Sequence, residues 1–259
     1  MPTDSSLPPS NPPRTTGWFE RLVPGVPVSL ARAFVVGAVV LVLYRFTCLE
    51  RTYIDEIQPR WDGGDRILPG LAATAWKALA TTTLLMGVPL TIVRFVDKVP
   101  LSTAGLAVGR ARDGVRYVTL FWLVMIPVLV AASFLPSFRF KYPLAPAAAD
   151  SLANLLIYEF LMLVYFFGWE FFFRGYFLFM LERHIGHVAV FVQMVPFALL
   201  HGNKPLPEAL GAVLVGIVLG VFALRTRTFL YCTVVHFVVS ATMDVTAIVH
   251  RGGWGVHGG

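Results

Sequence analysis

The residues able to do chemistry in this chain lie between positions 170 and 244, inside apolar segments. Glu170 and Arg174 stand four positions apart in "FFGWEFFFRGYFLFM", which otherwise holds apolar and aromatic residues and glycine. Residues four apart share a helix face, so the two charges can pair with each other. An ionisable group at the centre of a membrane helix costs ~2.5–3.5 kcal/mol on insertion scales. The pair therefore needs either a structural partnership or a function to explain it.

Two histidines follow in separate apolar runs. His201 ends "FALLH", and His236 lies well inside "LYCTVVHFVVSATMD". Ser240 comes one helical turn after His236 and Asp244 two turns after it, on much the same side. Either histidine alone has an ordinary explanation, at a membrane interface or bonded to a backbone carbonyl. Together the three segments supply a carboxylate, two imidazoles and a hydroxyl, which are groups that can activate water and stabilise an oxyanion.

Composition indicates the setting for these groups. The chain has 259 residues, of which 56% are hydrophobic and 14% charged, and its mean hydropathy is +0.70. These values predict an all-α polytopic membrane protein, because a span needs about 20 mostly apolar residues. The predicted spans, the fifth of them short, are 28–44, 71–95, 117–135, 151–167, 188–200, 207–224 and 229–249.

The span count depends on residues 151–183. As one helix these 33 residues reach roughly 50 Å, more than one bilayer core. A single tilted or bent helix leaves the basic segments "LERH" and "RTR" in the cytoplasm, as the positive-inside rule favours, whereas splitting it places both outside. We therefore predict seven spans with the C-terminus outside, with eight spans as the alternative.

Flanking segments and loops set the domain limits and the orientation. Residues 1–27 are rich in serine and proline and are predicted to be a disordered cytoplasmic tail, followed by a membrane domain over 28–250 and a flexible tail over 251–259. The loop 94–116 carries five Arg and Lys against two Asp, which predicts a cytoplasmic loop and N-terminus.

The net charge of +6 does not indicate nucleic-acid binding, because the basic residues sit in short loops and no soluble domain exists to carry a binding face. Cys48 and Cys232 show no disulfide pattern or metal-ligand spacing.

The order E-x-x-x-R, F-x-x-x-H, H-x-x-x-polar resembles the CPBP family of intramembrane endopeptidases. That family includes the type II CAAX prenyl proteases and the bacterial Abi bacteriocin-immunity proteins. The resemblance covers residues 102–247, from "STAGL" through "WEFFFRG" and "FALLH" to the last helix. It implies an integral protein of a bacterial-type inner membrane, in contact with lipid, that hydrolyses a peptide or protein substrate, lipidated in some members.

The resemblance also implies roles for individual residues. Carried over, Glu170 and His201 activate the water, His236 and Ser240 face the oxyanion, and Arg174 orients the glutamate. We expect no cofactor. A metal variant remains open, because Glu170, His201 and His236 would make a zinc set with one free position.

Two positions depart from the family pattern. Its first motif usually has two adjacent glutamates, and Trp169 occupies the first place here; a one-residue shift rotates a side chain by about 100°. Its third motif usually ends in Asn or Asp, where this chain has Ser240. A further carboxylate, Glu208, follows His201 and is expected to be solvated, although it can also enter the site.

Three function classes follow. An intramembrane peptidase predicts that Glu170, His201 and His236 converge on one polar cavity. A catalytically silent scaffold or bacteriocin-immunity factor predicts the same fold with Trp169 filling that cavity. A small-solute transporter, the more remote alternative, predicts polar residues spread along a pathway and often two related halves.

Overall fold

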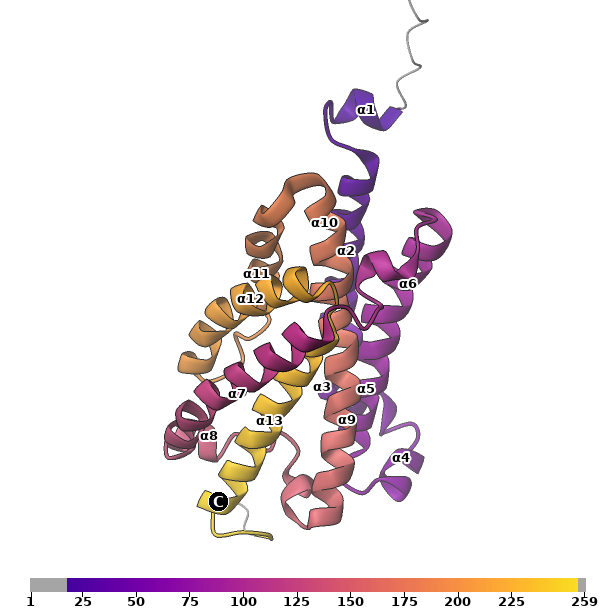
Figure 1. Ribbon diagram of the computed structural model, residues 1–259. Coiled ribbons are helices and arrows are strands. Elements are labelled where there is room, and N and C mark those ends of the chain that lie inside the picture. Colours follow the sequence, from indigo (N-terminus) through magenta and orange to yellow (C-terminus); the bar gives the residue numbers. More distant parts are fainter. Residues whose placement is uncertain (1–17, 256–259) are drawn as a thin grey trace, which may run out of the picture.

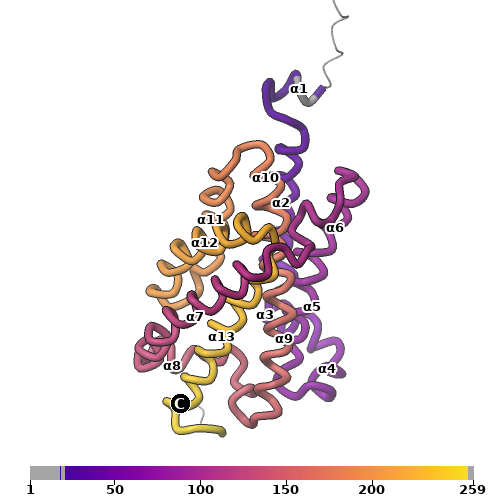
Figure 2. The backbone as a smooth tube through the Cα atoms, in the orientation of Figure 1, coloured from indigo at the N-terminus to yellow at the C-terminus, as the bar shows by residue number. Residues whose placement is uncertain are grey.

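The protein is an all-α bundle in the computed structural model, which describes residues 18–255 (Figures 1 and 2). No strand occurs among these residues, which confirms the predicted fold class. The helices are α1 (Trp18–Leu22), α2 (Val28–Thr47), α3 (Glu50–Thr52), α4 (Gly63–Ile67), α5 (Ala72–Thr82), α6 (Val88–Thr91), α7 (Ala111–Ser133), α8 (Pro136–Arg139), α9 (Leu152–Glu170), α10 (Leu178–Ile185), α11 (Ala189–Leu199), α12 (Leu206–Thr226) and α13 (Leu230–His250). The π-helical segments are η1 (Tyr53–Ile57), η2 (Thr83–Gly87), η3 (Ile92–Val96) and η6 (Phe171–Phe177), and the 3-10 segments are η4 (Leu101–Ala104), η5 (Pro146–Ala149) and η7 (Gly186–Val188).

The long helix that the sequence predicts is present. Within it, α9, η6 and α10 follow one another without a break from Leu152 to Ile185. The chain then reverses into α11, which at 11 residues is about 16 Å long and reaches only half of a bilayer core.

Six helices in the described part of the chain are long and apolar enough to cross a membrane, one of them the combined stretch Leu152–Leu199. Since that stretch contains both the long helix and its short return, α11, the predicted count of seven is approximate. The end of the chain near α1 and the C-terminal end of α13 lie at opposite ends of the bundle (Figure 1). Such an arrangement agrees with termini on opposite sides of the membrane.

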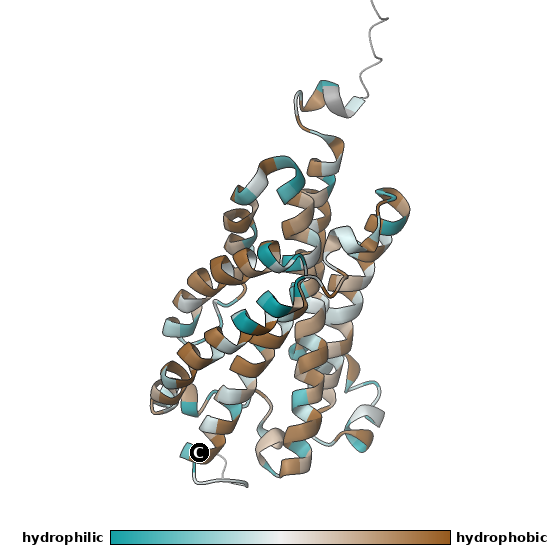
Figure 3. Cartoon of the chain, in the orientation of Figure 1, coloured by the Kyte–Doolittle hydropathy of each residue, from teal (hydrophilic) through white to brown (hydrophobic). Residues whose placement is uncertain are grey.

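Hydropathy along the chain fits a bilayer. The helices are mostly apolar over their length, and hydrophilic residues gather at their ends and in the loops (Figure 3). Large apolar side chains such as Val42 and Phe46 on α2 and Val124 on α7 are exposed. Exposed apolar surface on this scale marks a surface covered by lipid.

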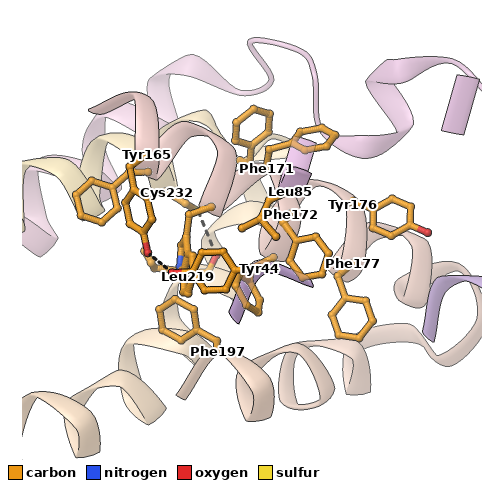
Figure 4. Packing of buried hydrophobic residues seen from close by; sticks show 14 of the residues in the cluster. Tyr44, Leu85, Tyr165, Phe171, Phe172, Tyr176, Phe177, Phe197, Leu219 and Cys232 are labelled. Carbon is orange, nitrogen blue, oxygen red and sulfur yellow. Dashed lines mark hydrogen bonds between the residues drawn. The ribbon is translucent and has the colours of Figure 1, made fainter. Parts of the chain in front are cut away.

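The core is aromatic and centres on η6. Every residue from Phe171 to Phe177 is buried, and their rings pack with those of neighbouring helices (Figure 4). A helix that is buried on all sides needs no polar face, so the apolar composition of this stretch explains its central position.

Close approach of α9 to α5 depends on one glycine. A Cβ placed on Gly168 would lie 2.5 Å from the Cα of Thr82. The Thr82 hydroxyl in turn donates a hydrogen bond to the Val164 carbonyl of α9, at 2.7 Å. Gly168 therefore fixes where the end of α9 packs, next to the residues that carry the chemistry.

The predicted tails lie partly outside the described residues, namely at 1–17 and 256–259. Trp18–Leu22 form the short helix α1, where we expected disorder up to residue 27. No proline occurs between Pro13 and Pro24, so the residues that form α1 include none that breaks a helix in this way.

Candidate active site

A cavity of about 680 Å³ opens toward the end of the bundle opposite α1, and His201, His236 and Ser240 line it. Its walls come from the end of α2, from α5, α9 and α13, and from the turn between α11 and α12. The structure thus brings together His201, from the turn after α11, with His236 and Ser240 of α13.

Glu170 stands behind this cavity rather than in its wall. Its side chain is fully buried, and it is not among the lining residues. Oε1 accepts hydrogen bonds from His236 Nδ1 at 2.7 Å and from Arg174 at 3.1 Å. Oε2 has no hydrogen-bond partner among the described residues. Glu170 therefore contacts the cavity through His236, whereas the family resemblance implied that it would act with His201.

Arg174 supplies the charge that balances Glu170. Its side chain is fully buried, and the predicted pair at i and i+4 is present. The guanidinium also lies over the Phe197 ring, 3.9 Å from its centroid, an arrangement that favours a cation. A carboxylate can stay ionised in such a place only with a partner of this kind.

His236 is held in one orientation. Its ring stacks on Phe166 with centroids 4.1 Å apart, and its side chain is 18% exposed. Because an ionised carboxylate only accepts hydrogen bonds, Nδ1 must carry the proton given to Glu170. In the neutral ring Nε2 is then an acceptor, which is the form that can take a proton from water.

His201 is anchored in a similar way. Its Nδ1 donates to the Phe197 carbonyl at 2.8 Å. Burial lowers the pKa of His201 from 6.5 to about 4, although the bond to the carbonyl opposes the shift. Near neutral pH the ring is therefore uncharged, with Nε2 as an acceptor.

The two imidazoles lie near each other in the cavity wall. Their centroids are 6.4 Å apart and their planes differ by 20°. A water that donates to two nitrogens at roughly 2.8 Å each spans about 4.4 Å between them, because its two O–H bonds diverge at about 105°. A shared water therefore requires the two Nε2 atoms to face each other across the cavity.

Trp169 lines the cavity, whereas its neighbour Glu170 does not. Its ring lies 5.6 Å from that of Tyr165 and 6.2 Å from that of His201, measured between centroids. The rotation of about 100° between neighbouring helix residues explains why one faces the cavity and the other lies behind it. Trp169 forms part of the wall and leaves the cavity open.

Ser240 and Asp244, both on α13, lie in different surroundings. Ser240 lines the cavity, and none of the hydrogen bonds within the described part of the chain involves its hydroxyl. Asp244 is fully buried, does not line the cavity and lies beside Glu159 of α9. The shared helix side expected for these residues therefore brings only His236 and Ser240 to the cavity.

One polar cluster in the wall was not expected. The Tyr142 hydroxyl contacts both oxygens of Glu208, at 2.7 and 2.6 Å, and Lys204 Nζ donates to the same hydroxyl at 2.7 Å. Burial lowers the pKa of Lys204 and raises that of Tyr142. Glu208 thus belongs to the cavity wall rather than to open solvent. The sequence gives no signal for this cluster, because Tyr142 lies about 60 residues away in an irregular loop.

The two cysteines are free and buried, as their spacing suggested, and the Cys232 thiol donates to the Leu219 carbonyl (Figure 4). The metal alternative involves Glu170, His201 and His236. Among the described residues no three His, Cys, Asp or Glu side chains are grouped to hold a metal. In addition, the Glu170 oxygen nearest the histidines is already bonded to His236 and Arg174.

Comparison with known proteins bears on the segment that carries this site. Residues 151–242 match the family described as Type II CAAX prenyl endopeptidase Rce1-like. The matched segment runs from the start of α9 into α13 and includes all five predicted site residues. No curated protein and no solved structure matches the chain.

Proposed function

We infer from the chain's membership of the type II CAAX prenyl endopeptidase (Rce1-like) family, carried by residues 151–242, that it hydrolyses a peptide bond within the membrane. The observation that supports this best is the 2.7 Å bond between His236 Nδ1 and Glu170 Oε1. A histidine backed by a buried carboxylate is a general base whose tautomer and orientation are fixed.

In the proposed reaction His236 is the base and Glu170 is its positioning residue. Water lies between His236 and His201 and gives one proton to Nε2 of His236 as its oxygen forms a bond to the carbonyl carbon. Glu170 stabilises the imidazolium that results. His236 then returns the proton to the nitrogen of the leaving amine while the carbon–nitrogen bond breaks. The immediate products are a carboxylic acid and an amine, and the acid then gives the second water proton to the amine, so no co-reactant other than water is needed.

Ser240 is assigned to the oxyanion. Its hydroxyl is free to donate and lies one helical turn from His236 on the same wall. His201 cannot donate from Nε2 while it is neutral, so its part is to hold the water. This division differs from the roles that the resemblance implied, in which Glu170 and His201 activated the water.

A second candidate is the catalytically silent scaffold, favoured by Trp169 in place of the usual first glutamate. That candidate requires a cavity that Trp169 fills. The cavity retains about 680 Å³ and keeps both imidazoles, those of His201 and His236, in its wall, which supports the peptidase.

The test uses the full-length protein in proteoliposomes with internally quenched peptides that end in Cys-aliphatic-aliphatic-X, with and without a prenyl group. Because the natural substrate is not identified, the N-termini of membrane proteins are also compared between cells that carry the wild type and cells that carry Glu170→Gln. Glu170→Gln and His236→Gln should each lower kcat by about 10²–10⁴-fold and should not add in the double variant.

The matched control is Glu159→Gln, a buried glutamate of the same helix that does not line the cavity, and it should retain activity. If Glu170→Gln cleaves as well as the wild type, the proposed role of Glu170 is wrong. If the wild type cleaves nothing by either readout, the scaffold is favoured. Chelators should leave the activity intact; their abolishing it would instead favour the metal variant.

A further inference from the structure

A second cavity, here called the N-face pocket, opens at the other end of the bundle. Its volume is about 280 Å³, and its polar lining residues are Ser29, Arg32, Asp97, Tyr176, Arg183 and His184. It lies where α2 and α10 run side by side near α1 (Figure 1). None of these residues belongs to the candidate active site, and the sequence analysis assigned them no role.

Tyr176 provides a donor without an acceptor. The residue is only 1% exposed, yet among the described residues its hydroxyl forms no hydrogen bond. Figure 4 shows the hydroxyl pointing away from the aromatic core, and the residue lines the N-face pocket. The hydroxyl opens onto the pocket and has no acceptor among the described residues, so it is available to donate a hydrogen bond to a ligand there.

The charges of the N-face pocket also favour an anion. Its one carboxylate, Asp97, is already bonded to Arg32. His184 Nε2 is bonded to the Ser29 hydroxyl at 3.0 Å. Arg183 has no ion-pair partner in the described part of the chain, and Nε of Arg32 is buried without a hydrogen-bond partner. Two guanidinium groups and a phenol thus offer more donors than Asp97 can accept.

The position of the N-face pocket identifies the source of the anion. Ser29 lies in the first turn of α2 and Asp97 directly after η3, so the pocket is level with the ends of two spans. Beside it, Val28, Phe95 and Val96 are exposed at 56%, 67% and 49%. Headgroup phosphates lie at this level in a bilayer, and the apolar side chains can meet the acyl chains.

We propose that the N-face pocket binds the phosphate of an anionic phospholipid, held by Arg183, the Tyr176 hydroxyl and Arg32, with its acyl chains against the exposed apolar side chains. Basic pockets between membrane helices bind anionic headgroups elsewhere. This site is independent of the proposed peptidase and is found at the opposite end of the bundle.

The experiment is native mass spectrometry of the full-length protein released from neutral detergent, with phosphatidylglycerol or phosphatidylcholine added. The wild type should retain phosphatidylglycerol in preference. Arg183→Gln should weaken that binding roughly tenfold, since a hydrogen bond to a charged group is lost, and Tyr176→Phe by a smaller factor. The matched control is Arg225→Gln, an exposed arginine at the same end of the bundle that does not line the pocket, and it should bind as the wild type does.

Equal weakening by Arg225→Gln and Arg183→Gln would overturn the proposal, because it would show only general attraction to a basic surface. Equal retention of both lipids by the wild type would overturn it without any variant. Millimolar free phosphate that displaces phosphatidylglycerol would assign the pocket to a soluble anion instead. Since these readouts measure binding alone, they are unaffected if the protein has no peptidase activity.

Discussion

Removing the Arg174 guanidinium is expected to destabilise the protein by about 3–5 kcal/mol, because it leaves a buried carboxylate without its cation. Glu170 is 0% exposed, and its hydrogen-bond donors among the described residues are Arg174 and His236. Arg174→Met keeps the unbranched stem beside Phe197, so the change removes charge and donors with little loss of packing.

The magnitude can be separated into two parts with a second variant. The contact of the guanidinium with the Phe197 ring, at 3.9 Å, contributes roughly 0.5–2 kcal/mol and is lost in every Arg174→Met background. The cost of the stranded charge disappears when Glu170→Gln is added, because the amide is neutral and its oxygen still accepts from His236. The double variant should therefore recover all but about 1–2 kcal/mol of the loss.

Thermal unfolding of the purified protein in detergent measures these differences. One kcal/mol corresponds to about 2–4 °C in a chain of this size, so Arg174→Met should lower Tm by roughly 10 °C and the double variant by only a few degrees. A single variant as stable as the wild type would refute the reasoning. A double variant no more stable than Arg174→Met would refute it equally, since the loss would then come from packing.

Three further predictions concern other parts of the structure. Because the pKa of His201 falls from 6.5 to about 4 on burial, its contribution to stability is complete above pH 6.5 and is lost as the pH falls toward 4; Tm should drop over this range in the wild type and less in His201→Asn. Gly168→Ala should destabilise by about 1–3 kcal/mol, since its Cβ would meet the Thr82 backbone, whereas Gly211→Ala, with open space at its Cβ, should be neutral or stabilising in the same melting assay. With the N-terminus in the cytoplasm, an impermeant maleimide should label Lys141→Cys at the cavity mouth in intact cells and Arg112→Cys only after permeabilisation; the reverse pattern would place the cavity on the cytoplasmic side.

The sequence predictions that the structure confirms are those that depend on local patterns of residues. Apolar runs of known length predicted the bundle and the long helix from Leu152, because burial of backbone groups in lipid demands helices. The spacing of Glu170 and Arg174 predicted their pair, because that contact depends on helix geometry alone.

The sequence did not predict which side chains meet between helices. Whether Glu170 meets His201 or His236 depends on how α9, α11 and α13 are rotated about their axes, which packing decides. The π-helical turns of η6 directly after Glu170 also change the rotation, and no residue pattern announces them. The cluster of Tyr142, Lys204 and Glu208 escaped for the same reason, since its members come from a loop and a helix start that only the fold brings together.

The geometry of α9 determines how Trp169, in the place of the family's usual first glutamate, affects the activation of water. A glutamate at position 169 would face the cavity, as Trp169 does, and could contact water directly. Glu170 lies behind the wall, so its negative charge acts on water only through the ring of His236. In the proposed reaction the base is then an imidazole that lines the cavity and donates a hydrogen bond from Nδ1 to Glu170. A carboxylate facing the cavity would need its basicity raised by burial to do the same work, and a buried carboxylate beside Arg174 is held ionised instead. With Trp169 in place of the first glutamate, the proposed reaction therefore uses an imidazole as the base instead of a carboxylate and still has a group that can activate water.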